Sequence, residues 1–136
     1  MEEIVTRIML IVGVLIVIAL TVVFLNGNKN QPESNLHSLT FTEVQGDIAK
    51  GAVMYDVRTL AEYIDGHFEN AKNFNVEDML AGKLPDVSKD KKIYVYCHSG
   101  NRSSRAASAL KAAGFTDIND LGGLSKVQSI GGKLIK

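Results

Sequence analysis

The one cysteine of the chain, Cys97, begins a segment whose residue types suit the storage of negative charge. The segment reads CHSGNRSSR over residues 97–105 and follows the apolar run IYVY. A helix is expected to begin just after it, so the first helical amides and the positive end of the helix dipole would surround the sulfur. Such a setting lowers a thiol pKa from about 8.5 to between about 3.5 and 7.5. We therefore predict that Cys97 is a thiolate nucleophile.

The residues that follow the cysteine predict a compact loop that cradles an anion. Gly100 can take a positive φ without strain, and a tight turn can point successive N–H groups inward to form an anion-binding nest. Arg102 adds a permanent cation, which either faces the site or braces the loop from outside. His98 either contacts the thiolate or substrate, or points to solvent. The predicted substrate-binding residues are His98, Ser99, Gly100, Asn101, Arg102 and Ser103.

The elements that must position this loop alternate along the chain. Thr40 with Glu43 and Thr59 with Glu62 have the spacing of capping boxes at helix starts. The predicted helices are 41–50, 59–66, 76–81 and 103–113, and the predicted strands are 52–57, 71–74, 93–96 and 115–118. This alternation predicts an α/β fold with a mainly parallel central sheet flanked by helices. Cys97 would then lie at the carboxyl end of a strand, where such sheets bind ligands.

Two charged residues, Asp56 and Arg58, also follow a predicted strand. They either reach the catalytic pocket or form an ion pair that positions neighbouring loops, and we favour the supporting role. His37 and His67 offer no metal-ligand spacing with Cys97, so no metal site is predicted.

The amino-terminal part predicts a membrane segment. Residues 8–25 are uncharged and apolar, and a helix of this length spans roughly 27 Å, close to the thickness of a bilayer core. A cleaved signal peptide is the alternative, although residues 23–26 are a poor cleavage site. We expect a tail at 1–7, a single transmembrane helix at 8–25, a flexible linker at 26–39 and a soluble domain at 40–136. The short tail favours a domain outside the cytoplasm.

Composition narrows the possible partners. The chain has 15 basic and 15 acidic residues and a formal net charge of zero, so it offers no basic field for nucleic acid. One cysteine excludes an intramolecular disulfide. The sequence predicts no oligomeric state.

Four segments together resemble one known family. The loop CHSGNRS resembles the active-site loop of the rhodanese sulfurtransferases. YDVR at 55–58 with Glu62-Tyr63, GHFENA at 66–71 and LGG at 121–123 resemble further family segments in the same order. The resemblance covers about residues 40–132. Two positions depart from it, because Phe68 stands where an aliphatic residue is usual and no tryptophan follows Gly123.

The resemblance implies a single-domain rhodanese fold and a reaction. Cys97 would take a sulfane sulfur from a donor such as thiosulfate, hold it as a persulfide and pass it to a thiophilic acceptor, with no cofactor. The acceptor could be a small molecule or a protein thiol. The alternative is a membrane-tethered persulfide carrier with little turnover. An arsenate reductase or a cysteine phosphatase is less favoured, because phosphatase-type loops hold five residues between cysteine and arginine and this loop holds four.

Overall fold

The computed structural model describes residues 1–4, 7, 9 and 38–136. The chain divides into two units between residues 37 and 38, and the second unit, Ser38–Lys136, has its own hydrophobic core. Within the described ranges, no helix is long and apolar enough to cross a bilayer. The predicted span of residues 8–25 lies outside those ranges except for Met9, so the membrane anchor stays a prediction.

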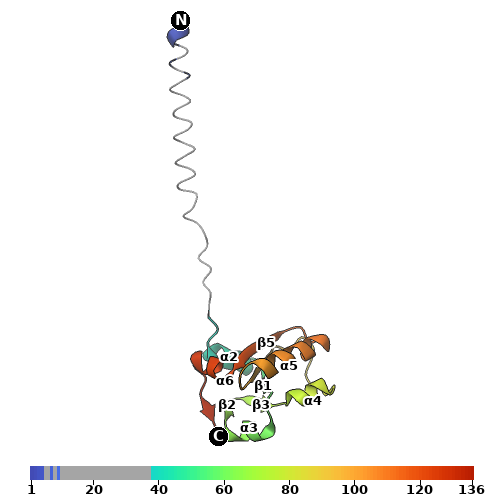
Figure 1. Ribbon diagram of the computed structural model, residues 1–136. Helices are drawn as coiled ribbons and strands as arrows, with labels where there is room; N and C mark the ends of the chain where they lie inside the picture. Colours follow the sequence, from blue (N-terminus) through green and yellow to red (C-terminus); the bar gives the residue numbers. More distant parts are fainter. Residues whose placement is uncertain (5–6, 8, 10–37) are drawn as a thin grey trace. The chain divides into compact units, whose positions relative to one another are not determined.

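A four-stranded parallel sheet forms the centre of the domain, in the order β3-β1-β4-β5. Strands β1, β3 and β5 of this sheet are labelled in Figure 1. Strand β4 (Ile93–Cys97) pairs with β1 (Val53–Asp56) on one side and β5 (Ile118–Gly123) on the other. Strand β3 (Ala71–Asn73) pairs with the outer side of β1. All three pairings are parallel, which confirms the predicted sheet type.

Both faces of the sheet are covered, as β4 shows. All five of its residues are buried, which is typical of a strand at the centre of a parallel sheet. Its odd-numbered side chains, Cys97 included, pack with α4 (Val76–Leu80) and α5 (Asn101–Ala112). Its even-numbered side chains pack with α2 (Phe41–Ala49) and α6 (Leu124–Ser129) on the other face. The cysteine therefore faces the layer that contains α5.

The predicted capping boxes are present at two helix starts. At α2 the Thr40 side chain accepts from the Glu43 amide, and the Glu43 carboxylate accepts from the Thr40 amide. Thr59 and Glu62 make the same reciprocal pair at α3 (Leu60–Asp65). Such a cap stabilises a helix by about 1 kcal/mol. The starts of both helices were predictable because the signal is local.

The predicted strand at 115–118 is wrong, because β5 begins only at Ile118. Phe115 instead closes the end of α5: its amide donates to the Leu110 carbonyl at 3.1 Å, and its ring is buried. An apolar residue after a helix-ending glycine satisfies a core position without continuing into a strand.

One predicted helix starts earlier than expected, and three short elements were not predicted from the sequence. Helix α5 begins at Asn101, two residues before its predicted start, because Gly100 at φ 101° turns the chain directly into it. Helix α6 and a small antiparallel pair, β2 (His67–Phe68) with β6 (Leu134–Ile135), were not predicted. These strands are two residues long, too short for a periodic signal.

Candidate active site

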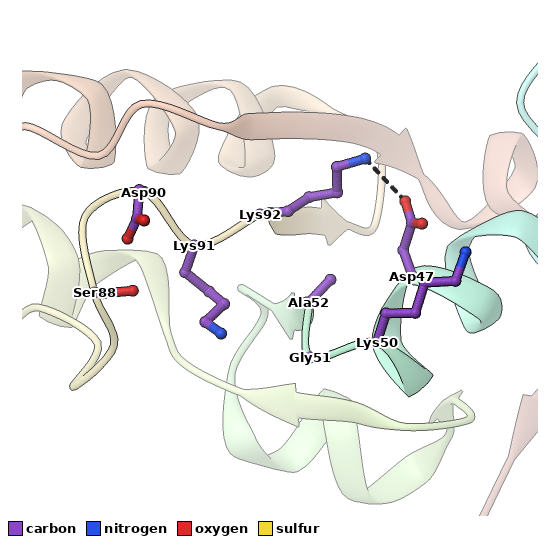
Figure 2. A pocket seen from close by; sticks show the side chains of 8 residues that line it. All are labelled: Asp47, Lys50, Gly51, Ala52, Ser88, Asp90, Lys91 and Lys92. Atoms are coloured by element: carbon purple, nitrogen blue, oxygen red, sulfur yellow. Dashed lines mark hydrogen bonds and ion pairs between the residues drawn. The ribbon is translucent and has the colours of Figure 1, made fainter.

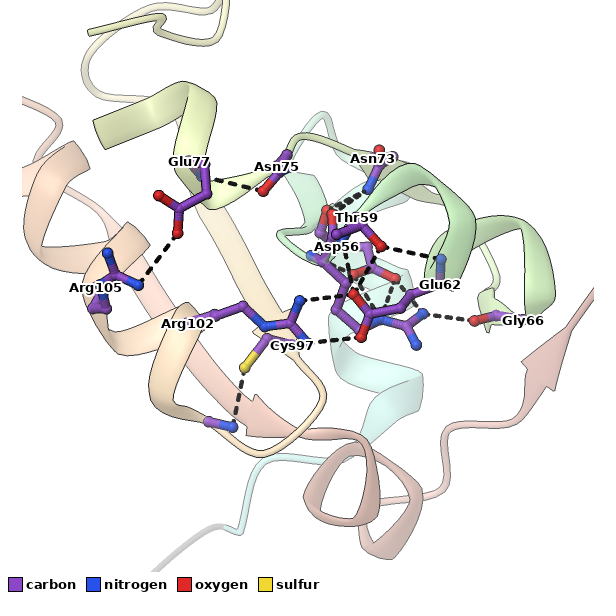
Figure 3. Close-up of polar contacts among 12 residues, drawn as sticks. Asp56, Thr59, Glu62, Gly66, Asn73, Asn75, Glu77, Cys97, Arg102 and Arg105 are labelled. Carbon is purple, nitrogen blue, oxygen red and sulfur yellow. Dashed lines mark hydrogen bonds and ion pairs between the residues drawn. The ribbon is translucent and has the colours of Figure 1, made fainter. Parts of the chain in front are cut away.

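Cys97 is the last residue of β4 and lies beneath the turn that leads into α5. Its side chain is buried, and the Gly100 amide donates to its sulfur at 3.0 Å (Figure 3). The strand fixes the cysteine, and the left-handed conformation of Gly100 turns the loop back over it. The sulfur is thus held at the carboxyl edge of the sheet.

The environment of the thiol favours its charged form. Burial raises the pKa of Cys97, but hydrogen bonds from the Ser103 amide and hydroxyl and from the amides of Gly100 and Ser99 lower it, and the net pKa is below the ordinary thiol value. Hydrogen bonds to a charged form stabilise that form. The backbone cradle thus compensates for the lost solvation of a buried thiolate.

Ser103 links this cradle to its surroundings. Its buried hydroxyl lies 3.0 Å from the Gly100 carbonyl, to which it can donate, and 3.4 Å from the Gly122 carbonyl. A hydroxyl has a single donor proton, so donation to one of these carbonyls competes with the donation to the sulfur that lowers the pKa of Cys97. Ser103 therefore contributes to both the shape and the charge of the loop.

Arg102 does not turn towards the sulfur. Its two terminal nitrogens each donate to one oxygen of the Glu62 carboxylate at 2.7 Å, in a bidentate pair between α5 and α3 (Figure 3). This pair lowers the pKa of Glu62 from 4.5 to about 2. In the structure the Arg102 guanidinium therefore joins α5 to α3, and its role towards a substrate stays a prediction.

Asp56 and Arg58 form a buried ion pair just behind this bridge. The Arg58 Nε donates to Asp56 Oδ1 at 2.9 Å, and a terminal nitrogen also donates to the Gly66 carbonyl at 2.6 Å. Both side chains are at most 5% exposed. The pair ties the end of β1 to the turn after α3, and its supporting role in the site stays a prediction.

Three of the predicted substrate-binding residues are exposed at the loop: His98, Ser99 and Asn101. The His98 ring has no hydrogen bond or ion pair to another described residue, whereas its carbonyl accepts from the Leu124 amide at 3.1 Å. Substrate binding by these side chains stays a prediction. Gly100 and Ser103 contribute to the cradle from inside it.

A glycine pair supports the loop from its other side. Ser99 forms an isolated antiparallel bridge with Gly123. A Cβ on Gly123 would lie 2.9 Å from the His98 carbonyl oxygen and 3.0 Å from the Ser99 Cα, both too close. Only a glycine lets β5 approach the loop this closely. The LGG segment is therefore part of the site's scaffold.

Two residues with structural roles at the site were not among the predicted site residues, namely Glu62 and Gly123. The sequence showed Glu62 as a capping residue and as part of a segment of the family resemblance, and nothing in it pairs Glu62 with Arg102, 40 positions away. Gly123 belonged to a segment noted only for its resemblance. Their roles depend on contacts between distant segments.

A separate cavity of about 280 Å³ lies at the opposite edge of the sheet, before the first residues of β1 and β4 (Figure 2). Its lysines include Lys92, whose ammonium binds the Asp47 carboxylate at 2.9 Å. The Tyr94 hydroxyl donates to the same oxygen at 2.7 Å. This cavity is not part of the Cys97 site. Among the described residues, no group of three or more His, Cys, Asp or Glu is placed to hold a metal ion.

Comparison with known proteins agrees with this geometry. The model of the rhodanese-like domain family matches residues 40–129. The uncharacterized protein YqhL of Bacillus subtilis is 32% identical over 83% of this chain and 89% of its own length. The thiosulfate sulfurtransferase GlpE of Pseudomonas fluorescens is 35% identical over 54% of this chain and 67% of its own. The crystal structure of a Rhodanese_3-like domain from Anabaena sp. matches with a TM-score of 0.57 and 32% identity, over 63% of this chain and all of that domain.

Several other relatives are longer proteins. The chain covers 28% of a probable molybdopterin-synthase adenylyltransferase of Porphyra purpurea and 26% of a tRNA uridine(34) hydroxylase of Onion yellows phytoplasma. The relatives therefore share the domain but differ in what the whole protein does. On the family match, the sheet order and the cysteine loop, this chain belongs to the rhodanese-like domain family, whose members include sulfurtransferases.

Proposed function

We propose that the protein is a sulfurtransferase that carries a sulfane sulfur on Cys97. The observation that carries the proposal is the cradle of amide groups from Ser99, Gly100 and Ser103 around the sulfur. Such preorganised donors stabilise both an attacking thiolate and a stored anionic sulfur. The relationship to a thiosulfate sulfurtransferase supports the same reaction class.

The proposed cycle has two displacements. The Cys97 thiolate attacks the outer sulfur of thiosulfate, the sulfur–sulfur bond of the donor breaks, and sulfite leaves with the bonding electron pair. Cys97 then carries a persulfide. An acceptor nucleophile such as cyanide attacks the outer sulfur, the persulfide bond breaks, and the thiolate is restored while thiocyanate leaves. No net electron is gained or lost by the protein.

The backbone amides of the loop are the groups that stabilise the negative charge on the Cys97 sulfur in this proposal. The Arg102 guanidinium is occupied by Glu62, so the cradle must supply the stabilisation of the negative sulfur. The amides point at a fixed location and need no reorganisation during transfer. The arginine acts by holding the first turn of α5 in place.

The test is turnover of thiosulfate and cyanide by the full chain. We expect thiocyanate to form, and mass spectrometry to show a gain of one sulfur atom after incubation with thiosulfate alone. Both signals should vanish in Cys97→Ser. A protein that forms neither thiocyanate nor a persulfide would rule the proposal out.

A second candidate is a persulfide carrier that docks a partner and turns over little alone. The longer relatives favour it, because there the shared domain makes up about a quarter of a larger protein. A carrier would form one persulfide per chain and release little thiocyanate. Multiple turnovers with small molecules would favour the enzyme instead.

The domain is further proposed to be tethered to a membrane by residues 8–25, with the domain outside the cytoplasm. The uncharged apolar run supports the tether, and the short amino-terminal tail supports the orientation. Proteolysis of the domain in intact cells and in inverted vesicles would distinguish the two orientations.

A further inference from the structure

A cavity of about 330 Å³ opens at the same edge of the sheet as the Cys97 loop. Its volume is within the range of small-molecule sites. It is lined by residues from the start of α3, the end of β3 and the region of α4, namely Leu60, Asn73, Phe74, Asn75, Asp78 and Lys83.

The strand register places this cavity near the cysteine. Asn73 ends β3 and pairs with Asp56 of β1, which in turn pairs with Tyr96, the residue before Cys97. Neighbouring strands are about 4.8 Å apart, so the ends of β3 and β4 lie about 10 Å apart along the edge. The Glu62–Arg102 bridge lies between them in Figure 3.

The side-chain amides of two asparagines that line the cavity, Asn73 and Asn75, provide one hydrogen-bond acceptor and one donor for a ligand. The Asn73 Nδ2 donates to the carbonyls of Asp56 and Arg58 at 3.1 and 2.9 Å, and the Asn75 Oδ1 accepts from the Glu77 amide at 3.1 Å. Within the described part of the chain, the Asn73 Oδ1 and the Asn75 Nδ2 have no partner. One free acceptor and one free donor complement the N–H and C=O of a peptide group.

The rest of the lining is apolar or charge-neutral. The side chain of Leu60 is 59% exposed, and Phe74 is half-buried. Asp78 and Lys83 bind each other at 2.7 Å, so they add no net charge that would select an anion. The lining therefore suits a peptide unit more than a free inorganic anion.

We propose that this cavity binds the peptide part of a cysteine-containing peptide that accepts sulfur from Cys97. The inference rests on the sulfurtransferase function proposed above and names its acceptor class. A peptide residue spans about 3.3–3.6 Å, so an acceptor of about three residues covers the roughly 10 Å between the end of β3, at the cavity, and the end of β4, at Cys97. Free cysteine is too short to occupy both places.

The transfer step balances without another reactant. The peptide thiol passes its proton to the outer sulfur of the anionic Cys97 persulfide, and the resulting peptide thiolate attacks that sulfur, so a new sulfur–sulfur bond forms on the peptide. The old sulfur–sulfur bond breaks, and its electron pair restores the Cys97 thiolate. The proton stays on the transferred sulfur.

The test compares two thiol acceptors on the full chain supplied with thiosulfate. Glutathione serves as the peptide probe and free cysteine as the short one, with rates expressed per thiolate. We expect kcat/KM for glutathione to exceed that for cysteine at least tenfold. Leu60→Ala should reduce this ratio at least fivefold, mainly through a higher KM for glutathione.

The matched control is Ile64→Ala, which truncates an equally exposed residue of the same helix that does not line the cavity. Its glutathione-to-cysteine ratio should equal that of the wild type. S-methylglutathione, which cannot accept sulfur, should inhibit competitively against glutathione, with an inhibition constant raised by Leu60→Ala.

Two results would overturn the inference: equal kcat/KM for the two thiols, or a preference that Leu60→Ala leaves intact. Thiocyanate formation by the same wild-type preparation separates this failure from failure of the proposed function. If thiocyanate forms and glutathione has no advantage, only the acceptor assignment is wrong. If neither thiocyanate nor a persulfide forms, the sulfurtransferase function itself fails.

Discussion

At the scale of single residues, the candidate site depends on a balance between burial and hydrogen bonding at one sulfur atom. Burial alone would raise the pKa of Cys97, and the amides of the loop reverse that effect. A shift of one pKa unit corresponds to about 1.4 kcal/mol between the two protonation states. Removing a single donor therefore has a measurable effect on reactivity at neutral pH.

Ser103→Ala tests this balance, because it removes a hydroxyl whose hydrogen bond lowers the pKa of Cys97. Iodoacetamide reacts with the thiolate, so the wild-type alkylation rate should rise with pH about a midpoint below that of a free cysteine. In the variant the midpoint should move up by about half a unit to one unit, which slows alkylation at pH 7 about three- to tenfold.

The control for this measurement is Ser108→Ala, on the exposed side of the same helix, where the serine hydroxyl donates to the Ser104 carbonyl. Its profile should overlay that of the wild type. A Ser103→Ala profile that also overlays it would show that the hydroxyl does not stabilise the thiolate.

At the scale of elements, the loop is held between two neighbours. Arg102 in the first turn of α5 is clamped by Glu62 of α3, and the turn before α5 rests on the end of β5 at Gly123. Glu62 also caps its own helix through Thr59. One carboxylate therefore links the start of α3 to the start of α5.

Glu62→Gln should destabilise the domain by about 1–2 kcal/mol at pH 7, because it removes a bidentate charge-assisted pair. The lower part of the usual range applies, since the side chains are 33% and 29% exposed. The Glu62 pKa is about 2 in the fold and 4.5 ordinarily, so its stabilisation is complete above pH 4.5 and is lost as the pH falls towards 2.

Urea unfolding at pH 7 and pH 3 would measure this difference. Wild type and Glu62→Gln should differ clearly at pH 7 and converge at low pH. Glu77→Gln is the control, because Glu77 contacts Arg105 at a longer 3.4 Å in an exposed pair, and it should change stability by less than about 0.5 kcal/mol. A constant difference at both pH values would contradict the role of the Glu62 charge.

Gly123→Ala should displace the loop from β5, because its Cβ would lie 2.9 Å from the His98 carbonyl oxygen. We expect thiocyanate formation to fall at least tenfold while the circular dichroism spectrum stays native-like. Gly46→Ala in α2 is the contrasting variant, since nothing lies within 4 Å of its added Cβ. It should stabilise the domain by about 0.5–1 kcal/mol and leave activity unchanged. Wild-type activity in Gly123→Ala would show that the close approach is dispensable.

In the whole molecule, the chain divides into two units, Met1–His37 and Ser38–Lys136. The domain from Ser38 onward buries two apolar clusters, one on each face of its sheet. Of the residues that the structure describes, none that precedes Phe41 belongs to either cluster. The domain is therefore expected to fold without the first 37 residues.

Deletion of residues 1–37 should yield a soluble domain that forms thiocyanate at the rate of the full chain. The full chain should sediment with membranes and resist extraction by alkaline carbonate, because its uncharged run of residues 8–25 is long enough to span a bilayer. Ultracentrifugation followed by immunoblotting measures the sedimentation of the full chain with membranes and its resistance to carbonate extraction. A full chain that is released by carbonate would rule out the transmembrane anchor.

The features that could be predicted from the amino-acid sequence are those that arise from local interactions. Two capping boxes located α2 and α3, an uninterrupted apolar run located β4, and the residues around Cys97 predicted a cradle for negative charge. Each of these signals lies within a few neighbouring residues, and backbone hydrogen bonding near a helix start needs no distant partner.

The features that could not be predicted depend on contacts between segments that are far apart in the chain. The Arg102 side chain pairs with Glu62 and not with the sulfur, and Gly123 packs against the loop. Strand β5 begins at Ile118. A guanidinium can pair with any carboxylate within reach, and a strand begins where a neighbour offers its backbone. The carboxylate partner of the arginine and the first residue of the strand are therefore set only when the sheet forms, because the energy of each pairing depends on distance and burial as well as on residue type.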